Sequence, residues 1–194
     1  MLFIDSILGR KSPLPRAILL TDAERDVDYA KILHRWRRQP LLIIVRHWHA
    51  TGQEALFKQL KPHASTPHHF SFTNPALAAK HRLKHLHVPE KTLKQRGTLN
   101  LPPLKKRFIL TTAVHSLPAL KRAERAGVHA VLLSPVFPTQ SHPHGKTLGA
   151  HQYRLIARQT RLPVYPLGGV TPKNIARLYH TRLRKRIAGL VFYL

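Results

Sequence analysis

The sequence predicts one α/β domain over residues 1–194, built as a (β/α)8 TIM barrel. A chain of 194 residues is long enough for a single hydrophobic core and short for two. Short apolar runs alternate with segments of helical period, which indicates parallel strands joined by helices. The runs are nearly continuous, as in Leu41-Leu-Ile-Ile-Val45, which is typical of strands covered on both faces. The eight expected strands are residues 17–21, 41–46, 68–73, 83–88, 107–113, 129–136, 163–169 and 188–194.

The residues between these runs predict where helices begin and end. Asn74-Pro75 and Thr171-Pro172 each place a capping side chain before a proline at the first helical position. Residues 51–54 (Thr-Gly-Gln-Glu) have the capping-box pattern. Ser116 is expected to start a helix that Gly127 ends in the left-handed conformation.

Two units of the alternation are weak. Residues 91–96 make a poor helix, and nothing follows the eighth run, so we expect the last helix of the barrel to be absent. An open Rossmann-like sheet is the alternative fold. It is disfavoured because no Gly-x-Gly-x-x-Gly follows any of the runs.

Charge and composition narrow the possible chemistry. Lys and Arg total 33 against 8 Asp and Glu, a net charge of +25. Such a field attracts polyanions, but the cations recur along the whole chain, so any nucleic-acid binding is expected to be non-specific. No acid follows Glu124, so the last third supplies no carboxylate pair for glycoside hydrolysis. The absence of cysteine excludes thiolate zinc sites and thiol nucleophiles.

No apolar run reaches the roughly 18 residues of a membrane span. The first residues also lack the basic region and long apolar stretch of a signal peptide. We therefore expect a cytoplasmic protein without a membrane partner.

A turn and a loop near the C-terminus carry the chemistry. At Gly168-Gly169 a strand ends and a helix is expected, which would bring backbone N–H groups close to an anion. In barrels, phosphates bind in the loops after strands 7 and 8. A pair of glycines alone is equally typical of a plain tight turn. The polar loop that starts at Ser134 could close over a substrate.

Several motifs between residues 107 and 174 together resemble the thiamine phosphate synthase/TenI family. The chain reads Ser134-Pro-Val-Phe-Pro-Thr139, then Leu148-Gly149, then Pro163-Val-Tyr-Pro-Leu-Gly-Gly-Val-Thr-Pro-Lys-Asn174, with Thr112-Ala-Val-His115-Ser116 upstream. The resemblance implies a (β/α)8 barrel whose partner is a small phosphorylated heterocycle. Synthases of this family use Mg²⁺ to join a pyrimidine diphosphate to a thiazole phosphate. TenI enzymes isomerise a thiazole phosphate carboxylate by proton transfer.

Departures from the family pattern favour the second activity. Pro75 and Thr92 stand where the resemblance places the aspartates that hold Mg²⁺. The loop Thr139-Gln-Ser141-His142 lacks the two lysines that grip diphosphate. We therefore expect no Mg²⁺ cofactor and a thiazole tautomerase. A Mg²⁺-dependent synthase, or a non-catalytic barrel that binds a phosphorylated ligand or RNA, stays open as an alternative.

The resemblance also implies the site residues. His115 matches the histidine that shuttles the proton in TenI, a role suited to a group that titrates near neutral pH. Gly168 and Gly169 are expected to bind phosphate. The expected substrate pocket comprises Arg46, Asn74, His87, Ser134, Thr139, Ser141 and His142.

Overall fold

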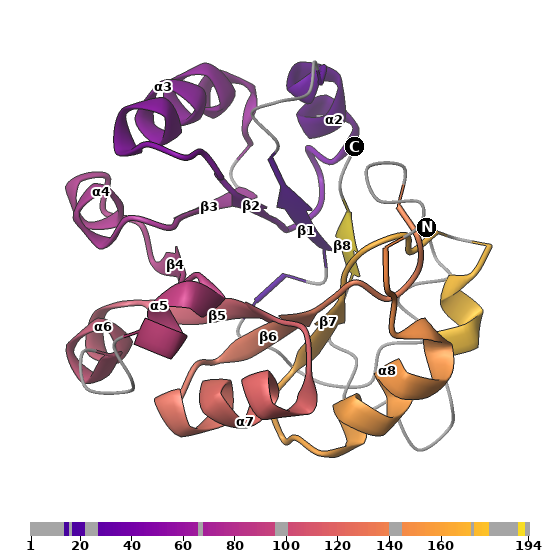
Figure 1. The fold of residues 1–194 in the computed structure, drawn as a ribbon. Helices are drawn as coiled ribbons and strands as arrows, with labels where there is room; N and C mark the ends of the chain where they lie inside the picture. Colours follow the sequence, from indigo (N-terminus) through magenta and orange to yellow (C-terminus); the bar gives the residue numbers. More distant parts are fainter. Residues whose placement is uncertain are drawn as a thin grey trace.

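All eight expected strands are present in one parallel sheet (Figure 1). The computed structural model describes residues 14–15, 17–21, 27–65, 68–95, 101–139, 145–171, 173–178 and 190–192. The strands follow the order β7-β6-β5-β4-β3-β2-β1-β8, and the sheet curls until β7 and β8 lie next to each other. The predicted (β/α)8 barrel is confirmed. The strands are β1 (Ala17–Leu20), β2 (Leu41–Ile44), β3 (His68–Phe72), β4 (His85–His87), β5 (Ile109–Val114), β6 (Ala130–Leu133), β7 (Val164–Pro166) and β8 (Leu190–Phe192).

Helices surround the sheet (Figure 1). They are α2 (Tyr29–Arg35), α3 (Ala50–Leu60), η1 (Lys61–His63), α4 (Pro75–Lys80), α5 (Glu90–Gln95), α6 (Leu101–Arg107), α7 (Leu117–Ala126), α8 (Gly149–Arg158) and η2 (Ile175–Leu178). No helix in the described ranges is long and apolar enough to cross a membrane. The expected absence of a helix after β8 concerns residues outside the described ones.

The core has two layers because successive strand residues point to opposite faces of the sheet. Leu19 and Leu86 belong to the outer layer between strands and helices, whereas Ile18 and Leu132 fill the barrel interior. Since Leu86 faces outward, its neighbours on β4 face the interior. The side chains that face the interior are therefore apolar on β1, β2, β6 and β7, whereas those on β3 to β5 are largely polar. The buried polar side chains of this second part are Ser71, His85, His87 and Thr111.

Three of the expected helix boundaries are confirmed by their hydrogen bonds. The Asn74 side chain accepts from the backbone N–H groups of Ala76 and Leu77 at 2.9 and 3.1 Å, and so caps α4. Ser116 caps α7 in the same way, and Gly127 ends that helix with φ of 71°. Both caps hold the start of a helix directly above the end of a strand.

The capping box at residues 51–54 is wrong. Helix α3 begins at Ala50 after His49, and no side chain caps it. The Glu54 carboxylate instead binds Lys80 and His81, at 2.9 and 3.0 Å, at the end of α4. The Lys80 ammonium group and the His81 ring at the end of the next helix outcompete a single backbone N–H for this carboxylate.

Two further local expectations are corrected. Residues 91–96 were expected to make a poor helix, but Glu90–Gln95 form the short α5, and residue 96 lies outside the described part. Helix α6 has its prolines in the first turn, where a backbone N–H is not required. After Gly169 we expected an α-helix from residue 172, which lies outside the described part. In the described part the helix is the 3₁₀ helix η2, and before it the Asn174 side chain accepts from the N–H of Thr171 at 2.8 Å.

Candidate active site

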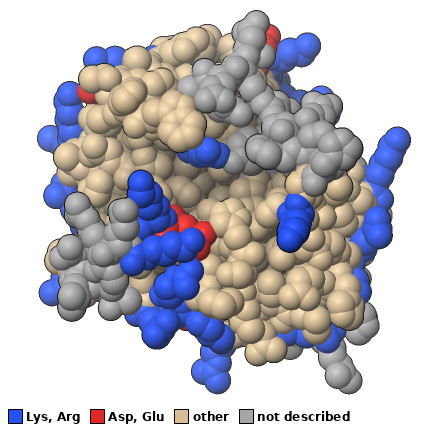
Figure 2. All heavy atoms as spheres, viewed as in Figure 1, with Lys and Arg blue, Asp and Glu red and all other residues tan. Residues whose placement is uncertain are grey.

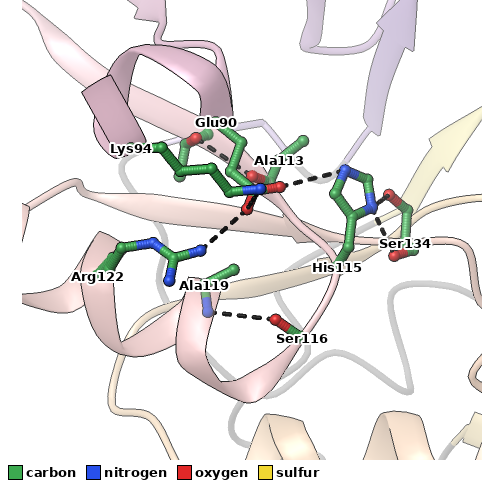
Figure 3. A network of polar contacts seen from close by, with 9 residues as sticks. Glu90, Lys94, Ala113, His115, Ser116, Ala119, Arg122 and Ser134 are labelled. Carbon is green, nitrogen blue, oxygen red and sulfur yellow. Dashed lines mark hydrogen bonds and ion pairs between the residues drawn. The ribbon is translucent and has the colours of Figure 1, made fainter. Parts of the chain in front are cut away.

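His115 stands immediately after β5, at the carboxyl end of the strands (Figure 3). Its Nδ1 lies 2.9 Å from the carbonyl oxygen of Ser134 and 3.2 Å from the hydroxyl of the same residue. A carbonyl oxygen can only accept, so we assign the ring hydrogen to Nδ1. Nε2 is then the nitrogen that exchanges a proton. The side chain is 53% exposed, so a substrate at the barrel mouth can reach it.

Glu90, which the sequence analysis did not select, faces His115 from the start of α5 (Figure 3). One carboxylate oxygen, Oε1, contacts Lys94 Nζ at 3.0 Å and Arg122 Nη2 at 3.2 Å. The other, Oε2, lies 3.6 Å from His115 Nε2. That distance is too long for a hydrogen bond but allows an ion pair with a protonated ring. The sequence signal was its position three residues after the end of β4, where barrel enzymes place functional side chains.

Ser134, His115 and Glu90 stand in a row that resembles the order of a nucleophilic triad. Ser134 is only 6% exposed, and its carbonyl oxygen is closer to the ring than its hydroxyl. The hydroxyl therefore has little access to a substrate, and Nδ1 is occupied by the carbonyl. The arrangement orients a histidine and does not activate a serine.

His87 and Arg46 lie on the interior side of the barrel. His87 is 5% exposed, and its Nδ1 is 2.9 Å from the hydroxyl of Thr111. Burial lowers the pKa of His87 to about 4, and the positive charge of Arg46 acts in the same direction. His87 is therefore neutral near pH 7. Arg46 is half-buried after β2, and its backbone N–H donates to the hydroxyl of Thr21 at 2.8 Å.

Gly168 and Gly169 form a turn that only glycine accommodates. Their φ angles are 90° and 62°. A side chain at Gly169 would collide with the backbone oxygen of Pro138, because the turn packs against the loop after β6. The N–H of Phe137 donates to the Gly168 oxygen at 3.0 Å and fixes this contact.

The same turn leaves backbone donors available. Within the described part of the chain, the N–H groups of Gly168, Gly169 and Val170 donate to no acceptor. Successive free N–H groups in a turn form a concave site for an anion.

The remaining expected pocket residues are placed as follows. Asn74 caps α4, just beyond the end of β3. Thr139 is half-buried in the loop after β6. Ser141 and His142 lie outside the described residues. The structure thus brings His115 and Ser134 into contact, and places Arg46 near His87 on the interior side.

Charged side chains are spread over the face that carries the mouth. Figure 2 shows Lys and Arg at many separate places on this face, with few acidic atoms between them. No single basic stripe is visible on it. Non-specific nucleic-acid binding stays a prediction.

Residues 73–189 match the sequence profile of a known family, described as thiamine monophosphate synthase. The chain belongs to the thiamine monophosphate synthase family. A curated relative is the "Putative thiamine-phosphate synthase 2" of Aquifex aeolicus (strain VF5), which is 32% identical over 109 residues. That alignment covers 56% of this chain and 56% of the relative, so the match spans about half the length of each.

Solved structures confirm the fold of this family member. The thiamine phosphate pyrophosphorylase of Pyrococcus furiosus superposes with a TM-score of 0.60 at 14% identity, over 92% of this chain and 85% of that one. FabK of Thermotoga maritima superposes with a TM-score of 0.63 at 15% identity, over 96% of this chain and 59% of that one. Proteins with such different names share this architecture, so the structural similarities support the barrel fold and say nothing about the activity.

Among the residues that the structure describes, we find no set of ligands for Mg²⁺ at the mouth. Mg²⁺ requires oxygen ligands, chiefly carboxylates. Pro75 and Thr92 occupy the positions where the family resemblance places aspartates. Among the described residues, no three His, Asp or Glu side chains lie close enough together to hold a metal. Glu90 is beside His115, but its carboxylate already contacts Lys94 and Arg122.

Proposed function

We propose that this barrel binds a thiazole phosphate at its mouth and isomerises it by metal-independent proton transfer, as a thiazole tautomerase. The observation that carries the proposal is the geometry of His115. Its ring is half-exposed at the end of β5, and Ser134 holds Nδ1 so that Nε2 is the nitrogen available for exchange.

This geometry suits an isomerisation. The reaction takes a proton from one atom of the substrate and returns it to another, so the composition of the substrate does not change. One group that serves first as base and then as acid is sufficient, and histidine does this near neutral pH. His115 Nε2 would accept the proton, and the resulting imidazolium would give it back.

The free N–H groups at the β7 turn support binding of the phosphate. Three successive donors, on Gly168, Gly169 and Val170, can surround an oxyanion without any charged side chain. The turn follows β7, in the part of the barrel where phosphates bind. We expect inorganic phosphate at millimolar concentration to raise the melting temperature, because a ligand of the folded state stabilises it.

A Mg²⁺-dependent thiamine phosphate synthase is the second candidate, and the name of the curated relative favours it. Coupling releases diphosphate, and a metal normally neutralises the charge that develops on this leaving group. The substitutions Pro75 and Thr92 argue against this activity.

Two assays on the full chain separate the candidates. In the first, the thiazole carboxylate phosphate is incubated with the protein and its isomerisation is followed. In the second, thiazole phosphate and pyrimidine diphosphate are supplied with Mg²⁺ and thiamine phosphate is measured. Isomerisation without coupling supports the tautomerase, and the reverse result establishes the synthase. Ligand-induced stabilisation with neither reaction would identify a barrel that binds without catalysis.

A further inference from the structure

Glu90 is in contact with both the cations and the histidine at the mouth. It lies three residues after the end of β4, and its side chain is 13% exposed. Lys94, on the next turn of α5, and Arg122, on α7, both contact Oε1. Oε2 is left facing His115 Nε2 at 3.6 Å (Figure 3). Two helices thus fix this carboxylate with one oxygen toward the ring.

We infer that Glu90 is a positioning residue that acts through His115 and stabilises its protonated form during proton transfer. The inference rests on the proposed function. When Nε2 takes up a proton, the ring becomes a cation that lies between the Ser134 carbonyl oxygen and the Glu90 carboxylate. The Nδ1 hydrogen is then bonded to the Ser134 oxygen. The Glu90 carboxylate, 3.6 Å from Nε2, stabilises the positive charge by electrostatic attraction and leaves the Nε2 hydrogen available to the substrate.

The two cations make this role specific. Lys94 and Arg122 hold Oε1, which limits rotation of the carboxylate and keeps Oε2 toward His115. A free carboxylate at this position could turn toward solvent. Glu90 therefore holds its negative charge close to His115.

A second carboxylate in the chain offers a matched control. Glu54 has similar partners, a lysine and a histidine at 2.9 and 3.0 Å, and a similar side-chain exposure of 18%. It joins α3 to α4 through Lys80 and His81. The variants Glu90→Gln and Glu54→Gln thus remove the same charge from comparable environments, but only one of them faces His115.

The kinetic test compares these variants in the isomerisation assay. Glu90→Gln should lower kcat by about tenfold to a hundredfold, the range found for carboxylates that orient metal-bound histidines, and should leave KM unchanged. Glu54→Gln should change neither. In a His115→Ala background, Glu90→Gln should have no further effect, because the two residues act as one unit. A full independent effect in that background, or a rise in KM alone, would overturn the inference.

A second measurement needs no turnover. Diethyl pyrocarbonate acylates the neutral imidazole ring, and mass spectrometry reports the rate at His115. Because the Glu90 carboxylate lies 3.6 Å from His115 Nε2, Glu90→Gln should speed this modification severalfold, and Glu54→Gln should not. An unchanged rate in Glu90→Gln would refute the role of Glu90 even if isomerisation is observed. If the wild-type protein does not isomerise the substrate, the proposed function fails, and the modification rate still decides whether Glu90 controls the charge of His115.

Discussion

His87 and His115 belong to neighbouring strands and meet opposite environments. His87 pairs in register with Thr111 of β5, and His115 lies four residues beyond that level. At roughly 3.3 Å per residue, His115 therefore lies about 13 Å further along the direction of the strand than Thr111. His87 is consequently closed inside the barrel against Thr111, whereas His115 is half-exposed at the mouth.

This difference shows that residue type does not separate a core histidine from a functional one. His87 ends β4 and His115 directly follows β5, and both have Nδ1 bound to an oxygen. What differs is that β5 extends beyond the end of its neighbour β4. The comparison therefore predicts that substitution of His115 removes activity, and that burial of His87 makes the free energy of unfolding depend on pH.

The largest effect is expected for His115→Ala. A general acid–base group typically contributes 10²–10⁴-fold, so isomerisation should fall by at least about a hundredfold. His115→Asn should do no better, because its amide does not exchange a proton near neutral pH. The melting temperature should change little, since the side chain is half-exposed. Unchanged turnover per folded molecule with a lower melting temperature would assign His115 to structure, as for His87.

At His87 we expect a pH effect on stability. Its pKa is lowered to about 4 in the folded protein by burial, whereas the unfolded chain has the ordinary value of 6.5. Between these values the unfolded state binds a proton that the folded state does not, so stability falls as the pH drops from 6.5 to 4. The full loss is about 3 kcal/mol at 1.36 kcal/mol per pKa unit.

The measurement is the free energy of unfolding in urea at pH 7 and at pH 4, for the wild type and for His87→Leu. The variant should lose less stability between the two pH values, by about the 3 kcal/mol of this linkage. An identical pH dependence would show that folding does not lower the pKa of His87.

The strands could be predicted from the sequence because their signal is local. Runs such as Leu41-Leu-Ile-Ile-Val45 are buried on both faces, and the alternation of short runs with segments of helical period indicated the strands. The caps at Asn74 and Ser116 were equally local, since each side chain bonds within three residues.

The contacts that build the site are not local. Glu90 meets Arg122 and His115 from other elements, which no pattern around residue 90 reveals. Glu54 failed as a capping residue for the same reason, because Lys80 and His81 are on another helix. His87 was expected in the pocket from its position at a strand end, and the relative lengths of β4 and β5, which place it inside, appear only in the register.

A smaller effect, on stability, is expected for glycine substitutions in the turn after β7, which lies in another part of the mouth. Gly169 and Gly149 have nearly the same positive φ, 62° and 64°, but only Gly169 has backbone atoms against it. Gly149→Ala should cost about 1–2 kcal/mol from its backbone conformation alone. Gly169→Ala should cost about 1–3 kcal/mol more, because its methyl group would overlap the Pro138 oxygen. Equal losses in urea unfolding would mean that the close contact is absent in solution.

The smallest effect is expected from metal removal, which we predict to leave isomerisation unchanged. The mouth contains Glu90 beside His115, but Lys94 and Arg122 already contact that carboxylate, and Pro75 and Thr92 offer no carboxylate of their own. Turnover should therefore be the same in EDTA and in millimolar Mg²⁺, while His115→Ala abolishes it in both. The informative control is the double change Pro75→Asp and Thr92→Asp, which restores the acids that the family resemblance places there. If a Mg²⁺ requirement appears only in this variant, the natural residues explain the independence from metal. A requirement in the wild-type chain would instead give the mouth a metal-dependent reaction and move the synthase to first place.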